Sequence, residues 1–405
     1  MNQENLGVIN LEFEVDKYDG KTPIFIYGAG VFGEYTLRAL EFRGIKPNGF
    51  CDRAKCGRDY LGLHIYDYKY LYSMNKPIVL LAVGAQYKNA ADFLEKTGIE
   101  YLDIYKLCFE DTTYDFVKLS TQARDILYYR RLYLFGKNTY GEKNNLTLFS
   151  IDWVITEKCS LRCRDCSNLM QYYHSPKNKS KMEAMNSLTK LLDVVDGIFD
   201  VRVIGGEPFM NQEMPYMLEE AVKLDKIQNL SIYTNATILP NEHMIAVMKN
   251  NKIKCEISDY GKLSRNLSGF IEIMEKENIR YHVVNIDEWH ELGPLKNRNM
   301  TIEEMKKIFS QCYCNDLLTL LDGKVYRCPH SAHGRNLEAI PYHEEDVVDL
   351  SSGSREYNRN KLQFMMFEKN YDYACGYCSG RNYHLGSVTP AIQTDHPLEY
   401  DKIHE

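Results

Sequence analysis

Three cysteines lie close together in the segment CSLRCRDC, as Cys159, Cys163 and Cys166. In a reducing compartment, closely spaced thiols are more often metal ligands than disulfides, and closed structural sites normally use four ligands. A cubane iron–sulfur cluster held by three thiolates keeps one iron open, as a catalytic zinc keeps a position for its substrate. The spacing therefore predicts a cluster that binds a small molecule. The alternatives are a structural zinc site and an unrelated iron–sulfur site.

Composition narrows the range of partners. The 405-residue chain has a net charge of −7, which argues against broad binding to nucleic acids or anionic membranes. The apolar run of residues 77–85 is too short to span a bilayer, and the N-terminus lacks the pattern of a signal peptide. We expect a cytoplasmic protein with no nucleic-acid or membrane partner. Its twelve cysteines would then serve as metal ligands, catalytic groups or core residues.

The N-terminal segment has the pattern of a nucleotide-binding βαβ unit. An apolar strand leads to Gly28, Gly30 and Gly33 in the spacing G-x-G-x-x-G, and a helical pattern and a second strand ending in Asp52 follow. These glycines permit a tight turn and the close approach of a pyrophosphate to a helix N-terminus. We expect a Rossmann-like nucleotide-binding domain over residues 1–110, and a domain of this fold that binds nothing is the alternative. It resembles the N-terminal domain of bacterial sugar acyltransferases, which holds a nucleotide sugar.

After a predicted helical linker over residues 111–148, strands alternate with helices. This alternation indicates parallel βαβ units, and about six of them would form a partial (β/α)6 TIM-like barrel over residues 149–295. In such barrels the active site lies at the C-terminal ends of the strands. The cysteines and the motifs GGEP, TNA and SDYG each follow a strand directly. We therefore expect them to form one site in an α/β fold.

These motifs resemble those of the radical S-adenosylmethionine (SAM) enzymes, over residues 149–286. The resemblance implies that the three cysteines bind a 4Fe-4S cluster, whose electron cleaves SAM reductively to a 5′-deoxyadenosyl radical that abstracts hydrogen from a substrate. In the family, GGEP contacts the methionyl amino group of SAM, and ribose contacts lie further along the chain. By the resemblance, the cofactor-binding residues are Gly205, Gly206, Glu207, Pro208, Thr234, Asn235 and Ser258. Asp165 departs from the family, which usually has an aromatic residue there.

A second group of cysteines resembles the auxiliary-cluster domain of these enzymes, of the twitch or SPASM-like type, over residues 296–386. The resemblance implies a second, auxiliary 4Fe-4S cluster, and four thiolates make a closed site suited to electron transfer or structure. Its ligands would be Cys312, Cys328, Cys375 and Cys378. A zinc ribbon is the alternative for this group. Beyond it we expect a flexible tail over residues 387–405.

Two residues are candidates for catalysis. Cys314 is left over from the second cysteine group, and three roles stay open for it: a ligand in place of Cys312, a hydrogen-atom donor, or a residue that packs against the cluster. Tyr260 follows a predicted barrel strand, so it is a candidate for substrate contact. A residue of the pocket wall is the alternative for Tyr260.

The resemblance leads to one preferred reaction and two alternatives. Twitch-type dehydrogenases of aminocyclitols oxidise an alcohol and use the auxiliary cluster as electron acceptor. Because the N-terminal domain indicates a sugar or nucleotide-linked small molecule, we expect a carbohydrate-modifying oxidoreductase of this kind, reduced by a flavodoxin- or ferredoxin-type donor. The alternatives are a redox-neutral epimerase with a cysteine hydrogen donor and a peptide-modifying maturase.

Overall fold

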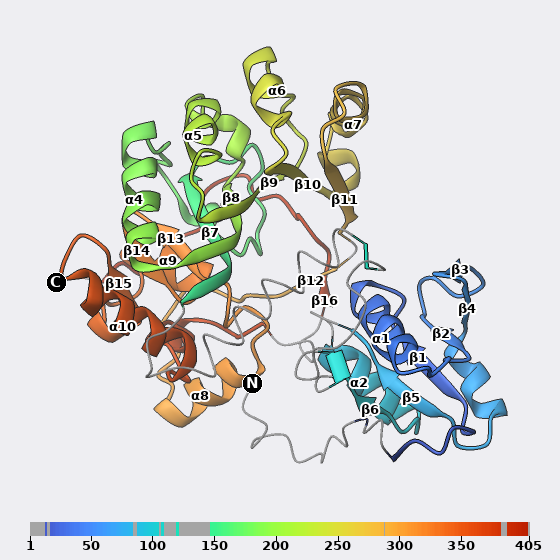
Figure 1. The fold of residues 1–405 in the computed structure, drawn as a ribbon. Helices are drawn as coiled ribbons and strands as arrows, with labels where there is room; N and C mark the ends of the chain where they lie inside the picture. The colour runs from blue at the N-terminus through green and yellow to red at the C-terminus, as the bar shows by residue number, and fades with distance from the viewer. Residues whose placement is uncertain are drawn as a thin grey trace. The chain divides into compact units, whose positions relative to one another are not determined.

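The computed structural model describes residues 13, 17–83, 87–104, 107–108, 119–120, 146–286, 288–381 and 387–403. The chain divides into two compact units, Met1–Arg131 and Leu132–Glu405, and each unit is described by itself (Figure 1). Most of the predicted helical linker of residues 111–148 lies outside the described residues. Within the described part of the chain, no helix is long and apolar enough to cross a membrane.

The first unit contains a six-stranded sheet with the order β3-β4-β2-β1-β5-β6. Strand β1 is apolar and completely buried, and it pairs in parallel with β2 on one side and with β5 on the other. The chain therefore winds outward from β1 in both directions, which is compatible with the expected nucleotide-binding topology. The elements are β1 Ile24–Tyr27, α1 Val31–Phe42, β2 Gly49–Cys51, β3 Asp59–Tyr60, β4 Leu63–Tyr66, β5 Ile78–Leu81, α2 Tyr87–Lys96 and β6 Leu102–Asp103.

Three glycines lie at the turn between β1 and the first residues of α1, and at two of them a side chain would not fit. Gly28 has a φ of +117°, and a Cβ atom there would lie 2.4 Å from the carbonyl oxygen of Ala82. A Cβ atom on Gly33 would lie 2.1 Å from the carbonyl oxygen of Gly28, so helix and turn are in direct backbone contact. Gly30 has open space around it. The glycines at positions 28 and 33 thus set the shape of the turn.

The second unit contains an eight-stranded sheet with the order β11-β10-β9-β8-β7-β13-β14-β15. Strands β7 to β11 are parallel, and helices α4 to α7 cover one face of them (Figure 1). This confirms the α/β fold class with a partial barrel. A sixth parallel strand, β13, pairs with the edge of β7 that β8 leaves free. It lies beyond residue 295, where the sequence predicted no strand parallel to β7. The elements up to β12 are β7 Thr147–Thr156, α4 Lys181–Val194, β8 Gly197–Gly205, α5 Met214–Ala221, β9 Ile227–Thr234, α6 Glu242–Met248, β10 Ile253–Asp259, α7 Leu267–Lys276, β11 Tyr281–Asn285 and β12 Trp289–His290.

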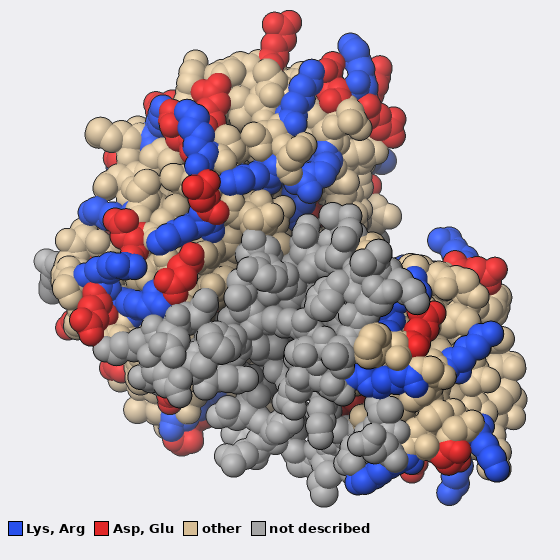
Figure 2. Space-filling model, viewed as in Figure 1, with Lys and Arg blue, Asp and Glu red and all other residues tan. Residues whose placement is uncertain are grey.

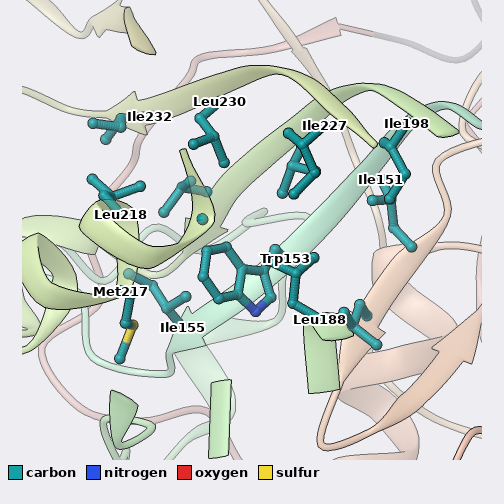
Figure 3. Packing of buried hydrophobic residues seen from close by; sticks show 14 of the residues in the cluster. Ile151, Trp153, Ile155, Leu188, Ile198, Met217, Leu218, Ile227, Leu230 and Ile232 are labelled. Atoms are coloured by element: carbon teal, nitrogen blue, oxygen red, sulfur yellow. The ribbon is translucent and has the colours of Figure 1, made fainter. Parts of the chain in front are cut away.

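The main core lies between these parallel strands and the helices that cover them. Trp153 of β7 is 1% exposed, and its indole nitrogen donates a hydrogen bond to the carbonyl oxygen of Ala184 in α4 at 3.2 Å. Leu188 of α4 and Met217 and Leu218 of α5 pack around it (Figure 3). Alternate residues of each strand face this core, so the intervening residues point to the other side of the sheet. We call that other side the inner face.

The region after β12 contains short elements that carry the second cysteine group. Helix α8 begins at a capping box made by Thr301 and Glu304. The β13–β14 hairpin turns at Asp322 and Gly323, both with positive φ, as in the tight hairpin turns that favour the Asp-Gly dipeptide. The elements are α8 Ile302–Gln311, β13 Thr319–Leu321, β14 Lys324–Tyr326, α9 Pro329–Asn336, β15 Val347–Asp349, α10 Arg355–Phe367 and β16 Ser387–Val388.

Residues 387–403, for which the sequence predicts a flexible tail, make ordered contacts in the structure. β16 pairs antiparallel with β12, and the backbone nitrogen of Leu398 donates to the carbonyl oxygen of Gln171 at 2.8 Å. The ring of Tyr400 packs edge-on against Tyr172 at 5.7 Å between centroids. Apolar side chains of the tail thus find partners around the cysteine loop, far away in the sequence, and the sequence does not predict these contacts.

Charged side chains of both signs share the surface of the protein. On the face drawn in Figure 2, lysine and arginine side chains lie interspersed with aspartate and glutamate side chains. Charges of the two signs are therefore mixed over the described part of that face.

Candidate active site

The three cysteines of the first group lie on the loop that follows β7. Cys163 is 7% exposed, and Cys159 and Cys166 are partly buried. Burial raises the pKa of the Cys159 and Cys163 thiols, and the nearby Cys166 thiol raises both further. The loop is fixed by a backbone hydrogen bond from Cys166 to Cys163 at 3.2 Å. The three thiols are therefore close neighbours at the C-terminal end of the first parallel strand.

The donor set of the first cysteine group consists of three thiols on one loop. Within the described residues, no group of three His, Cys, Asp or Glu side chains is arranged to hold a single metal ion. Thiolates of a cubane cluster bind separate irons, so they surround the cluster without meeting at one point. Cys159, Cys163 and Cys166 would hold three irons, and the fourth would stay open.

The GGEP turn after β8 lies directly against the cysteine loop. A Cβ atom on Gly205 would lie 1.9 Å from the carbonyl oxygen of Thr156, and one on Gly206 would lie 2.1 Å from that of Lys158. The backbone nitrogen of Glu207 donates to the carbonyl oxygen of Lys158 at 2.8 Å. Two glycines in succession are required because only a chain without side chains can approach this closely.

Glu207 connects the GGEP turn to the end of β9. Its carboxylate is completely buried and accepts hydrogen bonds from the Thr234 hydroxyl at 2.9 Å, from the Asn235 backbone nitrogen at 2.8 Å and from the Phe209 backbone nitrogen at 3.2 Å. Burial raises the pKa of Glu207 to about 7, although these hydrogen bonds act in the opposite direction. The carboxylate thus holds two strand ends together, and Thr234 uses its hydroxyl for the same purpose. Pro208 begins a short 3₁₀ helix and is buried.

Asn235, Ser258 and Tyr260 lie around the cysteine loop as well. The side-chain nitrogen of Asn235 donates to the Ser160 hydroxyl at 3.2 Å and lies 3.8 Å from the sulfur of Cys159. Burial raises the pKa of Tyr260, a hydrogen bond with Ser258 opposes the rise, and the thiols of the first cysteine group add to it. Its ring meets that of Trp289 edge-on at 5.6 Å between centroids. The structure therefore brings the predicted residues of this unit together around the three thiols.

The second cysteine group forms around the ends of α8, β14 and a short 3₁₀ helix, Tyr373–Tyr377. A hydrogen bond with Cys314 lowers the pKa of Cys312 to about 6, against the effect of burial. Cys314 is 6% exposed and also interacts with Cys328. The Cys375 thiol interacts in turn with those of Cys328 and Cys378. Cys314 therefore packs inside the second group.

Arg381 lies near both cysteine groups. Burial opposes its charge, but interactions with Cys314, Cys378 and Cys312 raise its pKa above the usual value. Burial raises the pKa of Cys166 in the first group, and the charge of Arg381 is among the effects that oppose this rise. One cation therefore interacts with thiols of the two groups at once. Arg381 was not predicted from the sequence, because no motif in the neighbouring residues marks it.

The inner face of the sheet carries a set of polar residues that the sequence analysis also missed. Asp152 and Arg202 form an ion pair at 2.7 Å, and the Ser231 hydroxyl donates to Asp200 at 2.5 Å. Burial raises the pKa of Asp152 to about 6, although Arg202 acts against the rise. Other members of the set are Tyr233, Lys254 and Glu256. Their signal in the sequence is a polar residue at every second position of otherwise apolar strands.

The glycine turn of the first unit forms a separate cluster of contacts. The carboxylate of Asp52 accepts hydrogen bonds from the backbone nitrogens of Ala29 at 3.0 Å and Ala54 at 2.9 Å. Lys55 donates to the carbonyl oxygen of Ala29 at 2.6 Å. Asp52 therefore supports the turn that begins at Gly28.

Comparison with known proteins identifies the class. Residues 153–257 match the model of the Radical SAM superfamily. The chain therefore contains a radical SAM domain, a class that uses a 4Fe-4S cluster and SAM, and the matched residues include the first cysteine group and the GGEP turn.

Similarity to curated proteins is confined to the same domain. The chain is 36% identical over 86 residues to GTP 3′,8-cyclase of Clostridium acetobutylicum, covering 21% of this chain and 27% of that protein. It is 30% identical over 96 residues to GTP 3′,8-cyclase of Petrotoga mobilis, covering 22% and 29%. The chain thus spans less than a third of the length of these relatives.

Solved structures of related enzymes are more distant. BtrN in complex with AdoMet and 2-DOIA matches 63% of this chain and 99% of its own, with a TM-score of 0.40 and 12% identity. The enzyme anSMEcpe with bound AdoMet matches 61% and 93%, with a TM-score of 0.33 and 14% identity. Streptococcus suis SuiB matches 70% and 79%, with a TM-score of 0.33 and 13% identity. Similarities at this level say nothing about the reaction of this chain.

The close contact of Gly206 with the cysteine loop makes a testable prediction. We expect Gly206→Ala to displace Lys158 and Cys159 and to lower the iron bound by the first cysteine group, because the new Cβ atom would overlap the Lys158 carbonyl oxygen. Gly197→Ala, at the start of the strand β8 that leads into this turn, is the matched control, since the nearest neighbour of the new Cβ atom would be 3.7 Å away. Iron content after anaerobic reconstitution measures the effect. Equal iron contents for the two variants would contradict this account of the turn.

The buried carboxylate of Glu207 makes a second prediction. Its pKa is raised in the folded protein, so the folded state binds a proton more readily than the unfolded chain, and this contribution to stability is lost as the pH rises through about 7. Because this contribution belongs to Glu207, we expect the unfolding temperature of Glu207→Gln to rise relative to that of the parent between about pH 5 and pH 7. Anaerobic scanning fluorimetry measures both. Glu220→Gln, at an exposed ion pair, should keep the parent slope, and a parent-like slope for Glu207→Gln would refute the prediction.

Proposed function

We propose that this protein is a radical SAM dehydrogenase that oxidises a hydroxyl-bearing carbon of a carbohydrate or nucleotide-sugar-type substrate. The observation that carries the proposal is a shared hydrophobic cluster, in which Cys159 and Cys166 of the first group pack with Ala374 and Tyr377, the sequence neighbours of Cys375 and Cys378. Two cysteine groups that adjoin one cluster of packed side chains are neighbours, and this arrangement suits electron transfer between them. An electron acceptor beside the radical site is what distinguishes an oxidation from a redox-neutral reaction.

Oxidation of an alcohol to a carbonyl removes one hydrogen atom, one proton and one electron. When bound, the cluster of the first group and SAM supply the radical chemistry that takes the hydrogen atom. In the proposal, Cys312, Cys328, Cys375 and Cys378 hold an auxiliary cluster of the twitch type, which takes the electron. Arg381 favours that transfer, because a nearby positive charge stabilises the more negative, reduced state of the acceptor.

In the proposal, the polar residues of the inner face bind a polar substrate. They also supply groups that accept the proton released when the alcohol is oxidised. Asp152, Asp200 and Glu256 provide carboxylates there, and Arg202 and Lys254 provide cations. With a pKa of about 6, Asp152 is close to the range in which a carboxylate works as a general base. Buried polar groups of this kind select substrates whose hydroxyl groups satisfy their hydrogen bonds. Tyr260 follows β10, and the three thiols affect its pKa; in the proposal it would orient the substrate.

The position of Cys314 favours oxidation over epimerisation. An epimerase needs a thiol that reaches the substrate radical from the face opposite to SAM. Cys314 instead forms a hydrogen bond with Cys312 and interacts with Cys328, inside the second group. In the proposal it therefore packs beside the auxiliary cluster. The first unit, with Gly28, Gly30 and Gly33, would bind a nucleotide or nucleotide sugar, and reducing electrons would come from a flavodoxin- or ferredoxin-type donor.

Isotope labelling tests the proposed reaction. In heavy water, with SAM and a panel of aminocyclitols and nucleotide sugars, we expect a carbonyl product that lacks two hydrogen atoms and carries no solvent deuterium. A double variant, Cys375→Ala with Cys378→Ala, should still cleave SAM but form no carbonyl product, because the electron has no acceptor. Cys255→Ala, at a buried cysteine outside both groups, is the control. Mass spectrometry reads both outcomes. A product of unchanged composition that contains solvent deuterium would identify an epimerase and refute the proposal.

A further inference from the structure

A short segment near the C-terminus pairs with the cysteine loop of the first group. We call residues 391–395 the C-terminal strap. The backbone nitrogen of Arg164 donates to the carbonyl oxygen of Ile392 at 2.8 Å, and that of Thr394 donates to the carbonyl oxygen of Arg162 at 2.9 Å. Cys163 and Gln393 thus face each other as an antiparallel bridge, although 230 positions separate them in the sequence.

The side chain of Gln393 makes three hydrogen bonds at this bridge. Its carbonyl oxygen accepts from the backbone nitrogen of Arg162 at 2.7 Å. Its amide nitrogen donates to the sulfur of Cys163 at 3.2 Å and to the carbonyl oxygen of Ala391 at 2.7 Å. One carboxamide therefore fixes the backbone just before Cys163 and contacts the sulfur itself.

Contacts further along hold the strap in place. The guanidinium of Arg162 donates to the carbonyl oxygen of Asp395 at 3.0 Å. Beyond the strap, the Tyr400 hydroxyl donates to the carbonyl oxygen of Leu337 at 3.0 Å, next to the end of α9 in the second cysteine region. The C-terminal residues therefore contact both the cysteine loop of the first group and the region that carries the second group.

We propose that Gln393 is a positioning residue for the cluster of the first cysteine group. It acts through Cys163, by orienting the ligand and by donating an N–H···S hydrogen bond. Hydrogen bonds to the sulfurs of a cluster raise its reduction potential, because they stabilise the reduced state, which carries more negative charge. The C-terminal strap thus sets how readily the cluster is reduced. The family match of residues 153–257 does not reach the strap.

Three variants separate this role from a general effect on folding. Gln393→Leu removes all three hydrogen bonds. Gln393→Glu keeps an acceptor for the Arg162 backbone nitrogen but removes the donor to sulfur and adds a negative charge. Ile392→Ala, at a side chain that is 38% exposed, changes the same strap and keeps its backbone pairing, so it is the matched control.

The readout is the midpoint potential of the cluster, measured by anaerobic redox titration with electron paramagnetic resonance. The signal of the open cluster is recognised by its change when SAM is added. We expect a more negative midpoint potential for Gln393→Leu, a still more negative one for Gln393→Glu, and the parent value for Ile392→Ala. Loss of iron from both Gln393 variants, with normal iron in Ile392→Ala, would also support the role. Parent-like potentials in the Gln393 variants, or shifts no larger than that of Ile392→Ala, would overturn it.

Discussion

The contact between two backbone segments, the GGEP turn and the cysteine loop, determines the geometry of the site. Gly205 and Gly206 lie against the carbonyl oxygens of Thr156 and Lys158 at distances that exclude any side chain. Glu207 then fastens this turn to the end of β9 through its buried carboxylate. Three strand ends are held in one arrangement by these contacts, so the three thiols have a fixed position at the C-terminal ends of the strands.

Electrostatics connects this site with the second cysteine group. Clusters held by thiolates carry negative charge, and a nearby cation makes such a cluster easier to reduce. Arg381 supplies such a cation, since it interacts with thiols of both groups. The N–H···S bond from Gln393 to Cys163 works in the same direction on the first group alone. The charge of Arg381 therefore acts on thiols of both cysteine groups, whereas the hydrogen bond from Gln393 acts on the first group alone.

Local motifs were predictable from the sequence, and long-range contacts were not. The three cysteines, GGEP and the α/β alternation are patterns of adjacent residues, and the fold and the radical SAM domain they predict are confirmed. The strap was missed because its pairing with Cys163 spans 230 positions and no local pattern marks it. The parallel strand β13 was missed because it is three residues long and reads as half of a hairpin. Arg381 was missed because its neighbours in space come from both cysteine groups.

The central claim is that one chain holds an open cluster and an acceptor cluster side by side. Iron and sulfide counts after anaerobic reconstitution test it most directly, on the parent and on a variant with Cys159, Cys163 and Cys166 changed to Ala. The account predicts about eight irons per chain in the parent and about four in the variant. About four irons in the parent and none in the variant would contradict it, because the second group would then hold no electron acceptor.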